Sequence, residues 1–194
     1  MQPKQPSSSG DDNNNKPSSS LSWYPQSQDD QAFLDLAIDE ACKGLKSGDG
    51  GPFGAVIVLR GKVIVQEHNR VLSTLDPTAH AEVVAIRKAC EILQTHQLQD
   101  CFLYASCQPC PMCFGAIHWS RIASCRYAAT SRDAALAGFD DQLLYENIRN
   151  MEHIPSTSHP RKSSFAWKHI AHPRATEAFQ LFAQLLGKGK TKLY

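Results

Sequence analysis

The sequence predicts one α/β domain, built from a single mixed sheet with helices on both of its faces. Short apolar runs typical of strands alternate with stretches whose apolar residues recur at helical spacing, after an opening hairpin. A chain of 194 residues is long enough for one compact core and leaves little room for a second. We therefore expect one folded domain over residues 30–194, preceded by an arm over residues 1–29.

The arm is rich in Ser, Asn, Pro, Gln, Gly and Asp, and its only large apolar cluster is Leu21, Trp23 and Tyr24. Such a segment buries too little surface to offset its ordering entropy, so we expect it to be disordered. It lacks the apolar core of a signal peptide, and no apolar run in the chain approaches membrane-spanning length. These features favour a cytoplasmic protein without a membrane partner.

The charges of the chain are balanced, because Lys and Arg total 20 while Asp and Glu total 19. The molecule therefore offers no broad positive field for a phosphate backbone, although a small basic patch is compatible with this balance. A nucleic-acid partner is disfavoured.

The first half of the domain reads as a helix, a hairpin, a loop and a second helix. Asp29 and Asp30 can cap a helix that carries apolar residues at helical spacing from Phe33 to Leu45. The breaker cluster Ser47–Pro52 ends it. The elements that follow are a strand (Phe53–Leu59), a turn (Arg60–Lys62), a returning strand (Val63–Glu67) and, after a loop, a helix capped by Thr78 that runs to about Thr95.

The second half continues the alternation and then becomes less regular. Its expected elements are a strand (Phe102–Ala105), a helix (Cys110–Ser120), a strand (Ile122–Tyr127), a helical turn (Arg132–Leu136), a short helix (Asp140–Asn147), a loop over residues 150–164, a fifth strand (Phe165–Ile170), an amphipathic helix (Pro173–Leu186) and a polar tail (Gly187–Tyr194).

The chain has seven cysteines, an odd number, which argues against a disulfide framework in a chain without a secretion signal. Four of them lie in helical or strand-like apolar patterns and are expected to be small buried hydrophobes: Cys42, Cys90, Cys101 and Cys125. The cluster of Cys107, Cys110 and Cys113 requires a chemical explanation.

His80, Cys110 and Cys113 have the residue types and the spacing of a zinc site. His80 lies in the first turn of one expected helix, and the two cysteines open the next, three residues apart and therefore on one face. Unpaired amides at a helix start favour anionic sulfur. Three N, S and S ligands leave one tetrahedral position open for water, which is typical of a catalytic zinc site. We predict a Zn²⁺ cofactor here.

Glu82 lies two residues after His80, so its side chain can be beside the metal without binding it. A carboxylate in that place can take a proton from water and return it to a leaving nitrogen. The pattern H-x-E followed by P-C-x-x-C is the known signature of zinc nucleobase deaminases, and all its fixed positions occur here in order. Glu82 is therefore the predicted catalytic residue of a hydrolase that acts on an amino-substituted carbon.

Other interpretations of the cluster stay open at this point. Cys107 could supply a fourth ligand and close the site into a structural zinc knuckle, which would leave Glu82 without a purpose. The cysteines could also form a redox pair or simply pack in the core.

Three segments resemble the cytidine-deaminase-like superfamily, and more narrowly its branch of bacterial guanine deaminases and plant guanosine deaminases. The segments are Gly50–Val58, Asp76–Glu82 and Cys110–Ile117. The resemblance implies a three-layer α/β/α fold with a mixed five-stranded sheet and the hydrolysis of guanine to xanthine and ammonia. It also implies a homodimer, in which the C-terminus crosses to the partner and its last aromatic residue, Tyr194, closes the active site in trans.

The resemblance also assigns residues that would contact the base: Phe53, Asn69 and Asp141, whose carboxylate would accept hydrogen bonds from the N–H edge of a purine. Each has a simpler alternative, since Phe53 could pack in the core and Asn69 could hold a turn. Asp140 and Asp141 could cap the helix that follows Gly138. Trp119 is a further candidate for the pocket wall, with a core or interface position as the alternative. Tyr194 could simply be solvated at a flexible end.

Gln108 departs from the branch, in which the residue before Pro109 is usually Glu. This change leaves the reaction class unaffected, because Glu82 carries the proton, but it can alter hydrogen bonding around the thiolates.

Guanine is the predicted small-molecule substrate, with guanosine as the alternative. A tRNA adenosine deaminase shares the zinc signature, but Pro111 between the cysteines, the Gly138–Asp141 element and a short basic tail favour a purine enzyme. A binding protein that merely kept the fold would not need a complete ligand set together with Glu82.

Overall fold

A computed structural model of the protein describes residues 25–150 and 165–194. Its centre is a five-stranded sheet with the strand order β2-β1-β3-β4-β5. β1 pairs antiparallel with β2 and β3, whereas β4 pairs parallel with β3 and β5. The predicted mixed sheet is therefore confirmed.

The elements follow the chain in an order close to the predicted one. The strands are β1 (Gly54–Leu59), β2 (Lys62–His68), β3 (Cys101–Cys107), β4 (Ser124–Ala129) and β5 (Ala166–His169). The helices are α1 (Ser27–Ser47), α2 (Val71–Thr74), α3 (Ala81–Leu93), α4 (Pro111–Trp119), α5 (Ser131–Leu136), α6 (Gln142–Asn150) and α7 (Glu177–Gly187).

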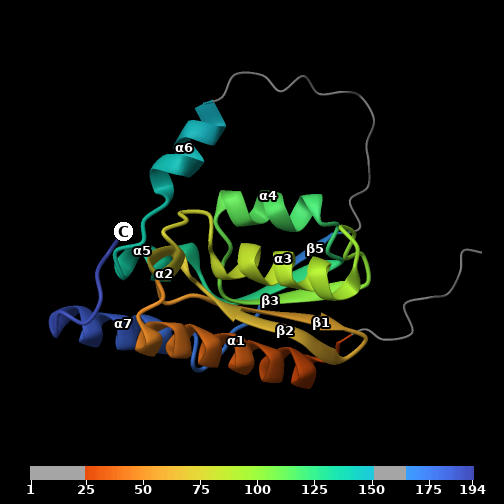
Figure 1. Ribbon diagram of the computed structural model, residues 1–194, viewed down its shortest axis with the longest axis horizontal. Coiled ribbons are helices and arrows are strands. Elements are labelled where there is room, and N and C mark those ends of the chain that lie inside the picture. Colours follow the sequence, from red (N-terminus) through yellow and green to blue (C-terminus); the bar gives the residue numbers. More distant parts are fainter. Residues whose placement is uncertain (1–24, 151–164) are drawn as a thin grey trace, which may run out of the picture.

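Helices cover both faces of the sheet, as the fold class predicts (Figure 1). α3 and α4 lie on one face, where they pack on residues such as Ile57 and Leu103. α1 and α7 lie on the other face, over Val56 and Phe102. The two faces take alternate residues of each strand, because successive strand side chains point in opposite directions.

The start of α1 is held by a buried ion pair on its own face of the sheet. Asp30 Oδ1 accepts a hydrogen bond from Tyr104 Oη and forms an ion pair with Arg126 Nε, both at 2.8 Å, and the Asp30 and Arg126 side chains are each 2% exposed. The Arg126 guanidinium also lies over the Phe102 and Tyr104 rings. The same helix therefore has a fixed position from its first turn.

Several element boundaries differ from the predicted ones for local reasons. α1 begins at Ser27, so the last residues assigned to the arm form its first turn, and Asp29 acts as the third helical residue of a capping box with Gln26. His80, and not Thr78, is the N-cap of α3, because Thr78 bonds to Asp76.

α2 is a single helical turn within the region expected to be a loop, and α7 begins at Glu177 after a series of turns. The predicted loop over residues 151–164 and the arm over residues 1–24 lie outside the described residues. In the part that the structure describes, no helix is both long and apolar enough to cross a membrane.

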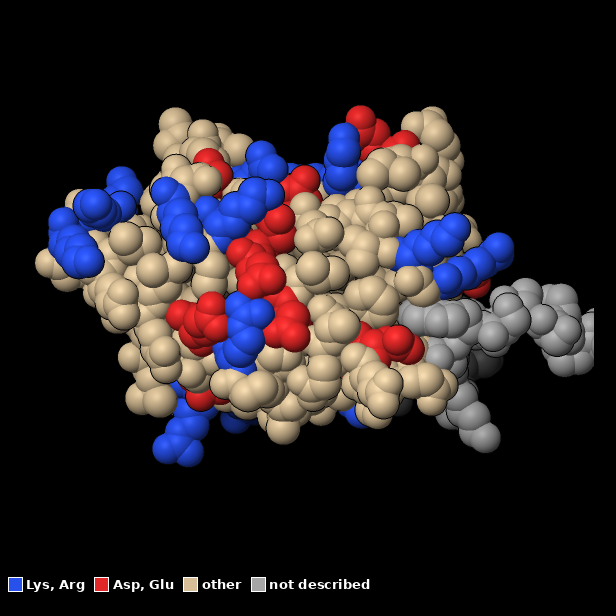
Figure 2. Space-filling model, turned by 90° about the horizontal axis from the view of Figure 1, so that it is seen from below, with Lys and Arg blue, Asp and Glu red and all other residues tan. Residues whose placement is uncertain are grey.

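Charges of both signs are interspersed on the face formed by α1 and α7 (Figure 2). Arg174 contacts the carboxylates of Asp35, Asp39 and Glu177 at 2.6–2.7 Å, which joins the two helices at the surface. This face shows no field of a single sign that would attract a phosphate backbone.

Candidate active site

The three predicted metal ligands come together at the starts of two helices. His80 is the N-cap of α3, Cys110 is the N-cap of α4, and Cys113 lies in the first turn of α4. Both Sγ atoms lie 3.6 Å from His80 Nδ1. In the described part of the chain, these three residues form the one group of His, Cys, Asp and Glu whose ligand atoms lie close enough to share an ion.

The separations of the ligand atoms fit a tetrahedral zinc ion. With Zn–N near 2.0 Å and Zn–S near 2.3 Å, tetrahedral geometry places N and S ligands about 3.5 Å apart. Cys107 does not join the group: it is buried and its Sγ contacts Thr130 O at 3.4 Å. The arrangement therefore leaves a fourth position free of protein ligands, as a catalytic site requires, and the knuckle interpretation is not realised.

The two thiols share their proton unequally. Hydrogen bonds from the Cys113 side chain, from His80 and from the Cys113 amide lower the pKa of Cys110 to about 4, although burial works against this. The pKa of Cys113 rises, because it keeps the shared proton and is buried beside the Glu82 carboxylate. A metal dication can replace that proton, so this pair of thiols suits zinc.

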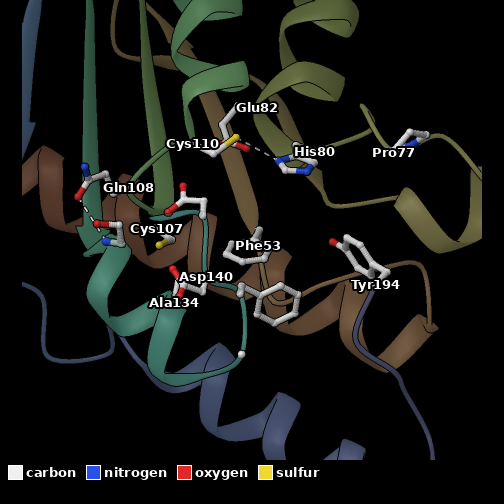
Figure 3. A pocket seen from close by; sticks show the side chains of 14 residues that line it. Phe53, Pro77, His80, Glu82, Cys107, Gln108, Cys110, Ala134, Asp140 and Tyr194 are labelled. Atoms are coloured by element: carbon white, nitrogen blue, oxygen red, sulfur yellow. Dashed lines mark hydrogen bonds between the residues drawn. The ribbon is translucent and has the colours of Figure 1, made fainter. Parts of the chain in front are cut away.

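Glu82 lies beside this group without belonging to it (Figure 3). Its residue is 7% exposed, and burial raises the pKa of its carboxyl, with the Cys110 charge adding to the rise and His80 opposing it. A carboxyl with a raised pKa holds its proton more readily and can both accept and donate it, which is the role predicted for Glu82.

The metal group and Glu82 face a cavity of about 400 Å³, a size typical of small-molecule sites. It is lined by Phe53, Pro77, His80, Glu82, Cys107, Gln108, Cys110, Ser131, Ala134, Gly138, Phe139, Asp140, Asp141 and Tyr194. The predicted site residues Phe53, Asp141 and Tyr194 are therefore brought together with the metal ligands.

Phe53 lies in the cavity wall and also packs in an aromatic cluster. Its ring makes edge contacts with Phe139 at 5.0 Å and Phe179 at 5.8 Å between centroids. Both alternatives for Phe53 are thus realised. Phe139 was not predicted as a site residue; the only signal for it was its place in the Gly138–Asp141 element.

The two adjacent aspartates divide their roles. Asp140 Oδ1 accepts a hydrogen bond from the Gln142 amide at 2.9 Å and so caps the start of α6. The Asp141 side chain is left for the cavity, and burial together with the Cys110 charge raises its pKa. The capping alternative therefore applies to Asp140 and not to the carboxylate of Asp141.

Asn69 lies behind the cavity wall and is completely buried. Its Oδ1 accepts hydrogen bonds from the Gly51 amide at 3.1 Å and the Val71 amide at 3.2 Å. Its Nδ2 group makes no standard hydrogen bond to a described residue, although the Tyr194 side chain lies close to it. Asn69 thus holds a turn, as its alternative states, and its Nδ2 group lies on the side of Tyr194.

Tyr194 lines the cavity of its own chain, near Phe53 (Figure 3). Its ring contacts Phe139 edge-on at 5.9 Å and is 47% exposed. A Cβ atom added to Gly51 would lie 2.6 Å from Tyr194 Oη, so the tail approaches the Gly51 backbone closely. In the single chain described, the tail returns from α7 to the pocket of the same chain, and closure by a partner's tail stays a prediction.

Trp119 is not brought to the site. It is the last residue of α4, is 85% exposed and does not line the cavity. Its assignment to the pocket wall is wrong, because the helix that begins at the metal ligands carries Trp119 to its opposite end.

Gln108 lines the cavity, and its Oε1 accepts a hydrogen bond from the Ser131 amide at 3.3 Å. A neutral amide here still ties the segment before α4 to the start of α5.

The family model that describes the cytidine and deoxycytidylate deaminase zinc-binding region matches residues 27–129. The guanine deaminase of Bacillus subtilis is 48% identical over 151 residues, which cover 74% of this chain and 97% of that protein. The tRNA-specific adenosine deaminase of Aquifex aeolicus is 42% identical, over 52% of this chain and 66% of that protein.

Solved structures are similar over most of the described fold. The X-ray structure of the Bacillus subtilis guanine deaminase has a TM-score of 0.61 and 45% identity, covering 79% of this chain and 92% of that one. A guanine deaminase from Nitrosomonas europaea has a TM-score of 0.61 and 27% identity, over 79% and 82%. With a family model that spans residues 27–129 and a relative aligned along nearly its whole length, the chain belongs to the zinc-binding cytidine and deoxycytidylate deaminase family.

Proposed function

We propose that the protein is a zinc-dependent guanine deaminase, which converts guanine and water to xanthine and ammonia. The observation that carries the proposal is one cavity lined by Glu82, by Asp141 and by two residues of the metal-binding group, His80 and Cys110. The likeness to guanine deaminases over almost the full length of the Bacillus relative supports the substrate.

The reaction replaces the amino group of the base by an oxygen from water. His80, Cys110 and Cys113 would hold a zinc ion, which would supply Lewis acidity and lower the pKa of water in the site. Glu82 takes a proton from that water as its oxygen bonds to the amino-bearing carbon, and then delivers the proton to the nitrogen as the C–N bond breaks. Ammonia leaves, and the carbon keeps the oxygen.

The remaining side chains select and hold the base. The Asp141 carboxylate accepts hydrogen bonds from the N–H edge of the purine, which a neutral amide would bind more weakly. Phe53 offers an aromatic surface in the wall, and Asn69 Nδ2 offers a donor. Tyr194 covers the cavity mouth and excludes water.

A panel of substrates tests the proposal: ammonia release is measured with guanine, guanosine, cytosine, cytidine, adenine and a tRNA anticodon hairpin. We expect turnover of guanine, and release from guanosine alone would favour the alternative nucleoside substrate. Release from the hairpin alone would refute a purine enzyme. The Glu82→Gln variant, with its zinc content confirmed, is the matched control that separates this chemistry from a contaminating deaminase.

We also propose that the protein is a cytoplasmic homodimer. Its cysteines are all free thiols, which suits a reducing compartment. The apolar side chains of Trp119, Leu143 and Ile148 are 85%, 68% and 47% exposed, and such surface is typical of protein contacts. Sizing with light scattering tests the dimer, and a Trp119→Lys variant that leaves a dimer intact would exclude α4 from the contact.

The predicted exchange of the C-terminus is a separate proposal that subunit complementation decides. A variant without Tyr194 and the Glu82→Gln variant are co-expressed, so that mixed dimers form. If Tyr194 acts in trans, the Glu82→Gln subunit completes the pocket of the truncated subunit and activity returns. If each tail closes the pocket of its own chain, activity stays at the level of the two parents.

A further inference from the structure

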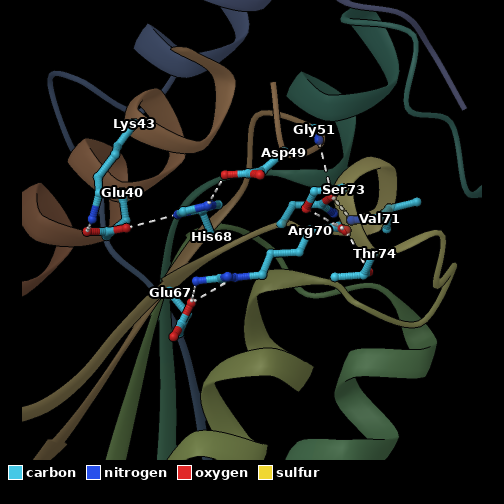
Figure 4. A network of polar contacts seen from close by, with 11 residues as sticks. Glu40, Lys43, Asp49, Gly51, Glu67, His68, Arg70, Val71, Ser73 and Thr74 are labelled. Carbon is cyan, nitrogen blue, oxygen red and sulfur yellow. Dashed lines mark hydrogen bonds and ion pairs between the residues drawn. The ribbon is translucent and has the colours of Figure 1, made fainter. Parts of the chain in front are cut away.

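A buried histidine, His68, joins three segments of the chain next to the active site. His68 is the last residue of β2 and is 5% exposed. Its Nδ1 lies 3.1 Å from Glu40 Oε2 in α1, and its Nε2 lies 3.0 Å from Asp49 Oδ2 in the loop after α1 (Figure 4). Both ring nitrogens therefore face carboxylate oxygens, one from α1 and one from the loop.

The helix makes room for this ring. A Cβ atom at Gly44 would lie 2.6 Å from the His68 ring, so a larger residue there would displace it. Glu40 is held from its other side by Lys43 Nζ at 2.9 Å. Burial opposes ionisation of Glu40, but the bonds from Lys43 and His68 hold the pKa of its carboxyl below the ordinary value. Two carboxylates thus face His68: Glu40 from α1, which is also paired with Lys43, and Asp49 from the loop.

Asp49, at the other side of the ring, fixes the loop through its backbone. Its amide donates to Gly44 O at 3.1 Å, and its carbonyl accepts from the amides of Leu72 and Ser73 at 3.0 Å. One residue thereby connects the end of α1 with α2. His68 is the side-chain contact that holds Asp49 against β2.

The residues that follow in both segments reach the cavity. Asn69, directly after His68, binds the Gly51 amide through Oδ1 and donates its own amide to Phe53 O at 2.9 Å. Phe53 lines the cavity, and Gly51 lies against Tyr194. A shift of the loop would therefore move three groups together: the Phe53 ring in the cavity wall, the Asn69 side chain, and the Gly51 backbone that Tyr194 approaches.

We propose that His68 is a positioning residue for substrate binding: by bridging Glu40 and Asp49, it fixes the loop and Asn69 in the geometry that receives the base. The metal ligands lie on α3 and α4, so this bridge does not touch them. His68 therefore sets the affinity for the substrate and leaves the metal centre intact. This inference rests on the proposed guanine deaminase function for its kinetic test, but not for its structural one.

The kinetic test compares His68→Gln and Asp49→Asn with the wild type, using guanine. Misplacement of a binding surface by about 1 Å can reduce catalytic efficiency up to about 100-fold, so we expect kcat/KM to fall by about 10- to 100-fold. Most of the loss should be in KM, with zinc content unchanged. Asp49→Asn is the second variant because the Asp49 side chain is partly exposed. Neutralising this carboxylate therefore disturbs the buried core less than replacing His68.

The matched control is Asp39→Asn. Asp39 lies in α1, next to Glu40, but its carboxylate contacts Arg174 at the surface and not His68. It should leave KM unchanged. An unchanged KM in His68→Gln and Asp49→Asn, a loss confined to kcat, or a loss of zinc would each overturn the proposal.

Hydrogen–deuterium exchange of the free protein supplies the structural test. The Gly51 amide should exchange faster in His68→Gln and Asp49→Asn than in the wild type and in Asp39→Asn, because the loop is released. Equal exchange in all four proteins would overturn the positioning role. Absence of guanine turnover in the wild type would refute the proposed function instead, while the exchange comparison would still decide the role of His68.

Discussion

Removal of the buried Asp30 carboxylate should destabilise the protein strongly without affecting its chemistry. In Asp30→Ala, the Arg126 guanidinium, which is 2% exposed, loses the carboxylate at 2.8 Å, and the Tyr104 hydroxyl loses its acceptor. Leaving one partner of a buried ion pair without the other costs about 3–5 kcal/mol. For a domain of this size, about 2–4 °C are lost per kcal/mol, so the midpoint of thermal unfolding should fall by about 6–20 °C.

Thermal and urea unfolding in excess zinc measure this loss, and guanine turnover at low temperature checks that the site is intact. The matched control is Asp39→Ala in the same helix, whose surface contact with Arg174 is worth about 0–1 kcal/mol. Replacing Arg126 by Leu as well should recover part of the loss, because the buried guanidinium charge that has lost Asp30 is then removed. A loss in Asp30→Ala no larger than in the control, or no recovery in the double variant, would refute this reasoning.

Three further predictions address the site and its supports. Glu82→Gln should lower kcat by at least about 100-fold with zinc retained, because general acid–base catalysis supplies about 10²–10⁴-fold in rate. Steady-state turnover of guanine measures this loss, and near-normal turnover would contradict it. Gly51→Ala should raise KM for guanine, because its Cβ would lie 2.6 Å from Tyr194 Oη; an unchanged KM would show that the tail does not close the pocket. Hydrogen bonds from the Thr130 amide and hydroxyl lower the pKa of Asp133, so its stabilisation is present above the unfolded pKa and is lost as pH falls through the folded one. Asp133→Ala should therefore cost about 1 kcal/mol at neutral pH, and urea unfolding at acidic pH should show the difference vanish.

The metal centre could be predicted from the sequence because its geometry is local. Cys110 and Cys113 are separated by one helical turn, and His80 begins another helix, so residue type and spacing determine most of the arrangement. What the sequence does not contain is the distance between the two helix starts. The parallel pairing of β3 with β4 and the packing of α3 against α4 supply it.

The sequence-based errors have local causes in two cases and a long-range cause in a third. Trp119 was a candidate for the pocket wall, but the length of α4 carries it away from the cysteines at the start of that helix. Thr78 has the residue type of an N-cap, yet its bonds to Asp76 leave that place to His80. His68 carried no signal at all, since its partners are 28 and 19 residues away and only the fold brings them together.

The catalytic and recognition residues differ in how firmly the fold holds them. His80 and Glu82 begin a helix that packs on the sheet, where Ala81, Ala85 and Ala89 are completely buried. Asp141, in contrast, precedes α6, in which no residue is buried and which projects from the body of the molecule (Figure 1). Segments with few buried contacts open at a small free-energy cost. Substitutions in α6 or in the tail should therefore change substrate affinity or choice while the zinc centre and the unfolding midpoint stay the same, whereas substitutions in the buried face of α3 should lower both stability and turnover.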